Sequence, residues 1–190
     1  MIARAAAPRS LLPALTGARI VAVPVVMALI LAGPDHDSAY SAAAVVFAIA
    51  ASTDFVDGYL ARRWAVTTKL GSFLDTTADK LLVTGALIAL VDVGRASAWI
   101  AAIIIGRELL ILGLRGVVAA DGMVFPPSIW GKLKTNVQFV AIFLAIVGWG
   151  GGLEPLRLDE WAMIAAAAIT VISAVEYIAR FSWALSEGPR

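Results

Sequence analysis

The chain contains no cysteine and only one histidine, His36, among its 190 residues. It can therefore form neither a disulfide nor a thiolate metal site, and a single histidine in a predicted loop disfavours zinc. Charged residues are also scarce: they make up 15% of the chain, whereas soluble domains carry roughly 25%. These shortages argue against a soluble domain.

Hydrophobic residues dominate instead, at 61% of the chain with a mean hydropathy of +0.88. A membrane-crossing helix needs about 20 mainly apolar residues, and segments of this kind recur along the whole sequence. The sequence therefore predicts one all-α integral membrane domain over residues 1–190, with six transmembrane helices around a polar cavity that faces the cytoplasm. The predicted spans are about 14–33, 39–62, 70–92, 97–119, 131–150 and 160–182.

The first predicted span resembles a signal peptide, because Arg4 and Arg9 precede an apolar stretch. Arg19 interrupts that stretch, however, and no small-residue cleavage site stands apart from it. We therefore expect a retained first helix, preceded by a short segment at about 8–16 that lies along the membrane interface.

Basic residues gather on alternate predicted loops and helix ends, and such residues favour the cytoplasmic side of a membrane. The intervening loops are more acidic, as around Asp35 and Glu154. This distribution predicts that both termini face the cytoplasm. No internal repeat is visible, which argues against a transporter built from duplicated halves. The basic residues on the predicted cytoplasmic side are Arg4, Arg9, Arg19, Arg62, Arg63, Lys69, Lys132, Lys134, Arg180 and Arg190.

Four aspartates interrupt the apolar sequence: Asp54, Asp57, Asp75 and Asp79. A carboxylate at bilayer depth costs roughly 2.5–3.5 kcal/mol, so four of them require something that neutralises their charge. Each residue of an α-helix advances by about 100°, which places the first two on one face of the second span and the last two on one face of the third. A short connection makes these spans antiparallel neighbours, and we expect their acidic faces to meet near the cytoplasmic surface.

Four converging carboxylates would form an all-oxygen site that suits Mg²⁺ or Mn²⁺. Small residues share the acidic faces, namely Gly58, Ala61 and Gly71, and they leave space for a bulky ligand to approach the backbone. With Arg62 on the same face, the pattern predicts a diphosphate bound through bridging metal ions. Any one aspartate could instead pair with a loop residue or reach water at a helix end, but this interpretation does not explain the complete pattern.

The complete pattern is Asp54-x2-Asp57-Gly58-x2-Ala61-Arg62-x8-Gly71-x3-Asp75-x3-Asp79. It resembles the signature of the CDP-alcohol phosphatidyltransferase family. The resemblance implies six transmembrane helices, a homodimer, two divalent cations and a location in a bacterial inner membrane. It also implies a reaction in which an alcohol displaces CMP from a CDP-linked lipid.

The resemblance assigns a role to each residue of the signature. Asp54, Asp57 and Asp75 would ligate metal, and Asp79 would contact the metal site and act as the general base on the acceptor hydroxyl. A carboxylate base must reach that hydroxyl at hydrogen-bond distance. The residues expected to line the cytidine diphosphate pocket are Gly58, Ala61, Arg62 and Gly71, together with Asp54.

The second half of the chain bears on the acceptor alcohol. The runs from Gly106 to Arg115 and from Gly131 to Gln138 resemble the branch of this family that uses glycerol 3-phosphate. The opening run Leu15-Thr16-x2-Arg19 and the run from Phe73 to Lys80 are also similar to that branch. That acceptor carries close to two negative charges, and arginine and lysine are suited to binding phosphate. We therefore expect an acceptor phosphate site at Arg107, Arg115, Lys132 and Lys134, with Glu108 orienting an arginine. The two lysines could instead anchor a helix end at the lipid headgroups, and Arg107 and Glu108 could form a structural pair.

Two departures from that branch are visible: Pro13-Ala14 stands where an asparagine is common, and Thr76 stands where a proline is common. Neither changes the four acids. The expected partners are CDP-diacylglycerol, glycerol 3-phosphate, the lipid bilayer and a second copy of the chain, with no nucleic acid. Two alternatives stay open: a related enzyme that uses inositol phosphate, and a divalent-cation transporter, since acids inside spans also mark ion pathways.

Overall fold

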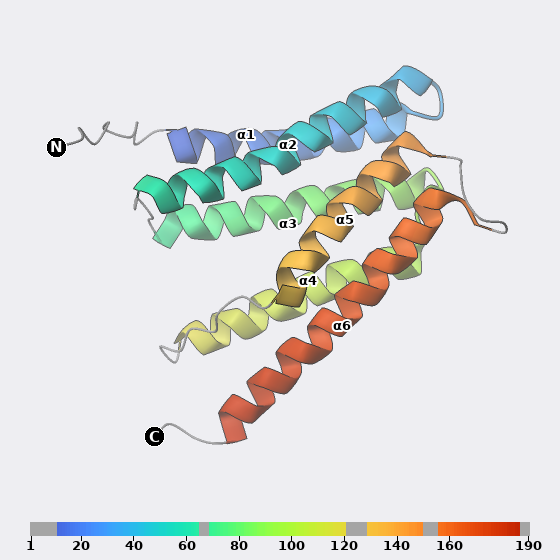
Figure 1. Cartoon of the computed structure of the whole chain (residues 1–190). Helices are drawn as coiled ribbons and strands as arrows, with labels where there is room; N and C mark the ends of the chain where they lie inside the picture. The colour runs from blue at the N-terminus through green and yellow to red at the C-terminus, as the bar shows by residue number, and fades with distance from the viewer. Residues whose placement is uncertain (1–10, 65–68, 121–128, 150–155, 187–190) are drawn as a thin grey trace. The chain divides into compact units, whose positions relative to one another are not determined.

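The computed structural model of the protein describes residues 11–64, 69–120, 129–149 and 156–186, with the side chains of 54–64 among those it does not describe. The described residues form six α-helices (Figure 1), whose ends lie within a few residues of the predicted spans. The all-helical fold is therefore confirmed. The helices are α1 (Leu11–Ala32), α2 (Asp37–Trp64), α3 (Lys69–Asp92), α4 (Ala98–Ala120), α5 (Ile129–Val147) and α6 (Leu158–Ser186).

Two segments of the described chain are long and apolar enough to cross a membrane, Ala14–Ala32 in α1 and Leu158–Ser182 in α6. Shorter apolar segments occupy Asp37–Thr53 and Leu133–Val147. The other helices are less apolar because they carry the charged residues of the predicted sites. Residues 11–16 belong to α1 without a break, and residues 8–10 of the predicted interfacial segment lie outside the described chain.

The chain divides into two compact units, residues 1–93 and 94–190. In the first unit, α1 packs along both α2 and α3, and α2 and α3 also touch. Figure 1 shows α2 running opposite to α1 and α3, as a short connection predicts. The core of this unit is made of fully buried apolar side chains, which include Val26, Ile30, Phe47, Leu82, Leu87 and Leu90.

In the second unit, α6 packs against both α4 and α5. Its core combines buried isoleucines of α4 and α5, such as Ile104 and Ile142, with two buried hydroxyl side chains of α6, Thr170 and Ser173. Buried polar groups cost free energy unless they are hydrogen-bonded. The presence of two such groups therefore indicates that polar partners lie on the neighbouring helices.

The ends of α5 and α6 are defined by local hydrogen bonds. Gly148, with φ of 69°, terminates α5 in the left-handed conformation that glycine adopts readily. Arg95 Nη1 donates to the carbonyl oxygen of Ile146 at 2.6 Å, which satisfies a carbonyl left over at the helix end. At the start of α6, the side chain of Glu160 accepts from the backbone N–H of Arg157 at 2.8 Å, as in a capping box.

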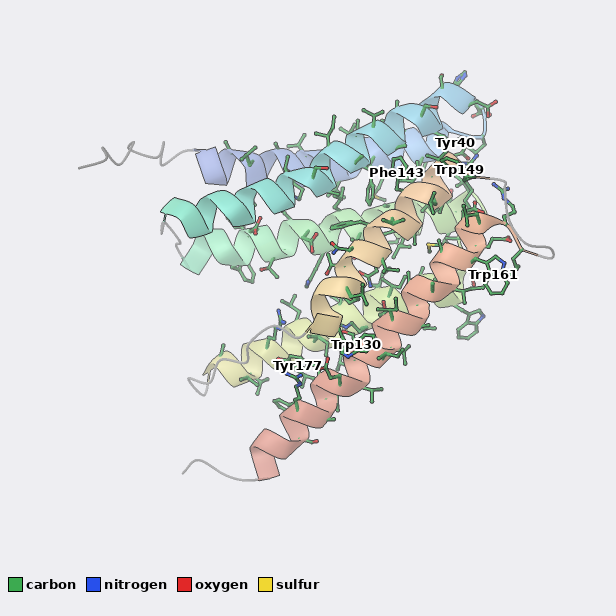
Figure 2. The ribbon with its side chains drawn as sticks, in the orientation of Figure 1. Tyr40, Trp130, Phe143, Trp149, Trp161 and Tyr177 are labelled. Atoms are coloured by element: carbon green, nitrogen blue, oxygen red, sulfur yellow. The ribbon has the colours of Figure 1, made fainter. Side chains whose placement is uncertain are left out.

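Tryptophans lie at helix ends with much of their surface exposed. Trp99 is in the first turn of α4, Trp130 in the first turn of α5, Trp149 just after α5 and Trp161 in the first turn of α6. Figure 2 labels the last three. Tryptophan is enriched where membrane meets water, so these positions are typical of the ends of membrane-spanning helices.

Candidate active site

The first half of the acidic signature lies on the last turns of α2. Asp54, Asp57, Gly58, Ala61 and Arg62 all belong to this helix, so the helical spacing from which a shared face was predicted holds along the segment. Their side chains lie outside the described part of the structure. Their contacts with metal or nucleotide therefore stay predictions.

The second half lies on α3, where Gly71, Asp75 and Asp79 follow one another at intervals of four residues. Residues four apart on a helix share a face. Asp75 is partly exposed, with 35% of its side-chain surface accessible, and Asp79 is also only partly buried. The two carboxylates of α3 therefore form one stripe, as the sequence predicted.

Arg19 of α1 joins this stripe through a contact that was not predicted from the sequence. Its Nη1 donates to Asp75 Oδ1 at 2.9 Å, and its Nη2 lies 3.4 Å from Thr53 Oγ1 on α2. The Arg19 side chain is completely buried. Because Thr53 directly precedes Asp54, Arg19 connects the two helices that carry the signature.

The residues of the signature suit a hard divalent cation, because their donors are all carboxylate oxygens. Asp75 uses one oxygen for Arg19 and has a second oxygen for another ligand. Within the described residues no three acidic or histidine side chains gather at one point; that part of the chain contains the side chains of Asp75 and Asp79 but not those of Asp54 and Asp57.

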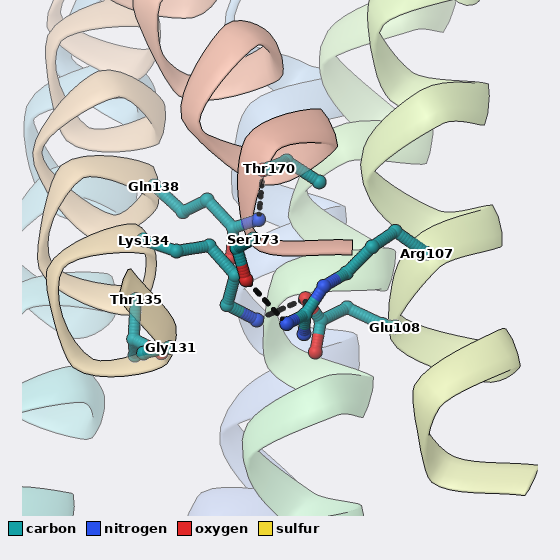
Figure 3. Close-up of polar contacts among 8 residues, drawn as sticks. All are labelled: Arg107, Glu108, Gly131, Lys134, Thr135, Gln138, Thr170 and Ser173. Carbon is teal, nitrogen blue, oxygen red and sulfur yellow. Dashed lines mark hydrogen bonds and ion pairs between the residues drawn. The ribbon is translucent and has the colours of Figure 1, made fainter. Parts of the chain in front are cut away.

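The second unit contains a buried polar cluster made of three charged residues, Arg107, Glu108 and Lys134, and one hydroxyl residue, Ser173 (Figure 3). Lys134 Nζ on α5 donates to Glu108 Oε1 on α4. The same oxygen lies 3.3 Å from Arg107 Nη1, while Arg107 Nη2 donates to Ser173 Oγ on α6 at 2.6 Å. The side chains of the three charged residues are 10% exposed or less. The cluster therefore connects all three helices of the unit.

A neutral hydrogen bond lies beside this cluster. Gln138 Nε2 on α5 donates to Thr170 Oγ1 on α6 at 2.8 Å, and both residues are buried (Figure 3). Gln138 is one helical turn from Lys134, and Thr170 is three residues from Ser173, so the two sets of contacts form adjacent layers. The layers explain why α6 buries hydroxyl side chains in an otherwise apolar core.

Of the four residues predicted for the acceptor phosphate, the structure brings Arg107 and Lys134 together through Glu108. The expected contact between Glu108 and Arg107 is present, and the contact with Lys134 was not expected. Arg115 is exposed and lies over the ring of Tyr177 on α6, 5.7 Å from its centroid. Lys132 belongs to α5, but its side chain lies outside the described part.

Sequence reasoning missed two contacts of these sites. Arg19 was interpreted as a basic residue of the first span and as part of a run that resembles the glycerol 3-phosphate branch, but no contact was predicted for it. Ser173 was not singled out. A signal for Arg19 was present, because it is the one charged residue in the sequence of α1, and a charged residue inside a span is by default a candidate for a functional site. No comparable signal marks Ser173, since serine is common in helices that pack closely in membranes.

The chain belongs to the CDP-alcohol phosphatidyltransferase family, whose model matches residues 11–172 and so extends over both units. Together with the two strongly apolar helices, this membership identifies a membrane protein. Members of the family generally depend on a divalent metal ion. The match gives no support to the alternative of a divalent-cation transporter.

Named relatives are similar over most of the chain. A Bacillus subtilis protein named CDP-diacylglycerol–glycerol-3-phosphate 3-phosphatidyltransferase is 38% identical over 177 residues, which cover 87% of this chain and 92% of that protein. A Mycobacterium tuberculosis protein named probable phosphatidylglycerophosphate synthase is 42% identical, covering 87% of this chain and 78% of that protein. An Escherichia coli protein with the same name as the first is 42% identical over 72% of this chain and 76% of its own length.

Proposed function

We propose that this protein transfers the phosphatidyl group of CDP-diacylglycerol to sn-glycerol 3-phosphate, which gives phosphatidylglycerophosphate and CMP. The observation that carries the proposal is the complete acidic signature on two consecutive helices of a chain whose relatives, similar over most of its length, carry the name of this activity. The buried cations of the second unit add the charge that a phosphorylated acceptor requires.

The metal site is proposed to consist of Asp54, Asp57, Asp75 and Asp79. These residues would hold two divalent ions, Mg²⁺ or Mn²⁺. Bound there, divalent ions would neutralise the charge of the diphosphate and the negative charge that develops while the phosphatidyl group is transferred. The helical residues Gly58, Ala61, Arg62 and Gly71 would line the pocket of the CDP-lipid with Asp54. Small residues on that face allow the nucleotide to approach the helix backbone.

Asp79 is proposed as the general base. The acceptor hydroxyl oxygen would attack the phosphorus attached to diacylglycerol, the bond from that phosphorus to CMP would break, and the hydroxyl proton would pass to the Asp79 carboxylate. CMP leaves with the bridging oxygen, so no other reactant is needed. General bases of this kind contribute about 10²–10⁴-fold to rate, which sets the expected size of the effect when the base is removed.

The acceptor phosphate is proposed to bind Arg107, Arg115, Lys132 and Lys134. Support comes from the excess of positive charge around Glu108, where two buried cations share one carboxylate. A phosphate that enters such a cluster meets donors that are already desolvated, and charge-assisted hydrogen bonds of this kind are stronger than neutral ones. Arg115 adds an exposed guanidinium on the same helix as Arg107.

The membrane arrangement is proposed from the distribution of charge. We infer that residues 1–190 form one domain in which all six helices cross the bilayer, with both termini and the active site on the cytoplasmic side of a bacterial inner membrane. The basic ends of the predicted spans support this orientation. We also propose a homodimer, as the family resemblance implies.

An acceptor assay tests the proposal. Purified protein is incubated with CDP-diacylglycerol and Mg²⁺, and glycerol 3-phosphate and inositol phosphate are supplied in separate reactions, with CMP release and the lipid product measured in each. We expect product with glycerol 3-phosphate. Turnover with inositol phosphate alone would assign the protein to the other branch, and flux of divalent cations through proteoliposomes without lipid substrate would favour the transporter.

A further inference from the structure

Arg19 is a buried cation at the acidic site, and neither the signature nor the relatives' names assign it a role. It is the one charged residue within α1, and its side chain is completely buried. A charge taken out of water destabilises the fold unless it is paired and hydrogen-bonded. Its partners include Asp75 of the signature, at 2.9 Å, and Thr53, at 3.4 Å.

The pair divides the two oxygens of Asp75. Oδ1 accepts from Arg19, which favours Oδ2 as the oxygen that would face a metal ion at this carboxylate. A hydrogen bond to one carboxylate oxygen fixes the orientation of the ligand, as neighbours of metal ligands commonly do. Arg19 also places a fixed positive charge beside the site, which lowers its net negative charge before any metal ion arrives.

From this geometry, and on the basis of the proposed metal-dependent transfer, we propose that Arg19 is a built-in counter-cation and a positioning residue for Asp75. Arg19 stabilises the acidic site when it holds no metal and orients Asp75 when it does. The same charge repels the incoming divalent ion. Because the repulsion between full charges at short range exceeds the contribution of one orienting hydrogen bond, Arg19 weakens metal binding while it supports turnover.

Substitutions of Arg19 distinguish the proposed role from a role in helix packing alone. In Arg19→Gln the repulsion is lost, so we expect Mn²⁺ to bind about tenfold more tightly while kcat falls, because Asp75 is no longer held. Arg19→Lys keeps the charge and should bind Mn²⁺ with nearly the wild-type affinity. A residue that only packs α1 against its neighbours would give the opposite sign, with weaker metal binding in the glutamine variant.

The experiment uses the full-length protein in detergent without lipid substrate. Mn²⁺ binding is measured by electron paramagnetic resonance, and thermal unfolding is followed in EDTA and in saturating Mn²⁺. We expect a larger rise in Tm with Mn²⁺ in Arg19→Gln than in wild type. Arg180→Gln is the matched control: it removes an ion pair on α6 between an exposed arginine, Arg180, and the partly buried Glu176, and none of these quantities should change.

Unchanged or weaker Mn²⁺ binding in Arg19→Gln would overturn the proposal. If that variant unfolds in EDTA, the proposal requires Mn²⁺ to restore folding. Failure to restore folding would also contradict the proposed role of Arg19 as a counter-cation. The wild-type arms test the proposed function separately. Wild-type protein that binds no Mn²⁺ or transfers no phosphatidyl group refutes that function, whereas a failure confined to the Arg19 variants refutes only this inference.

Discussion

Lys134 of α5 donates to the same oxygen of Glu108, Oε1, that lies near the Arg107 guanidinium of α4. One carboxylate therefore serves two buried cations, which leaves the cluster with one net positive charge. Removing one partner from a buried ion pair leaves an uncompensated charge and costs about 3–5 kcal/mol. Glu108 is thus expected to hold the cations in place, while the excess charge is what an acceptor phosphate would neutralise.

The first prediction concerns Glu108→Gln. The change removes the negative charge that both Arg107 and Lys134 contact, so we expect Tm to fall in detergent. Glycerol 3-phosphate should raise Tm more in this variant than in wild type, because its phosphate replaces the missing charge. Glu176→Gln, which affects a partly exposed pair with Arg180 outside the cluster, is the control and should show neither effect. If glycerol 3-phosphate stabilises Glu108→Gln no better than wild type, the cluster does not bind the acceptor.

A second prediction separates the two substrates. Arg115 is exposed and lies over the ring of Tyr177. Arg115→Ala therefore removes a positive charge without breaking a buried ion pair. We expect KM for glycerol 3-phosphate to rise about tenfold, as the loss of a charge-assisted phosphate contact implies, with little change for CDP-diacylglycerol. Steady-state kinetics with each substrate varied in turn measures this, and Tyr177→Phe, which keeps the ring, is the control. Equal effects on both substrates would contradict the acceptor assignment.

The third prediction tests the general base. Asp79→Asn keeps the size of the side chain and removes its ability to take a proton. We expect turnover to fall by about 10²–10⁴-fold, with Mn²⁺ and CDP-lipid still bound. Equilibrium binding and single-turnover kinetics on the same preparation distinguish the two effects. A rate near that of wild type would remove Asp79 from this role.

Sequence alone predicted the six helices because each is an apolar segment bounded by polar or charged residues, and it predicted the acidic stripe because residues four apart share a helix face. It could not predict which residues meet between helices. Arg19 and Asp75 are 56 positions apart, and neither helical spacing nor composition specifies that contact. Likewise, Arg107 and Lys134 were predicted as phosphate ligands, but nothing in the sequence indicated that Glu108 would connect them.

The last prediction tests how closely α1 must approach α3. Gly85 of α3 faces α1, and a Cβ atom added there would lie 2.8 Å from Val23 Cγ1 and 3.0 Å from Met27 Sδ. Methionine can adjust, but the branched side chain of valine is stiff, so Gly85→Ala should push the helices apart and cost about 1–3 kcal/mol of stability.

Gly113→Ala on α4 is the matched control, because an added Cβ meets nothing within 4 Å and alanine favours the helix by about 0.5–1 kcal/mol. Thermal unfolding in detergent compares the two variants. Since Arg19 is carried by α1 and Asp75 by α3, a displacement of α1 should also lower turnover in Gly85→Ala, whereas Gly113→Ala should leave it unchanged. If Gly85→Ala is as stable as wild type, close contact between α1 and α3 is not what maintains the pair.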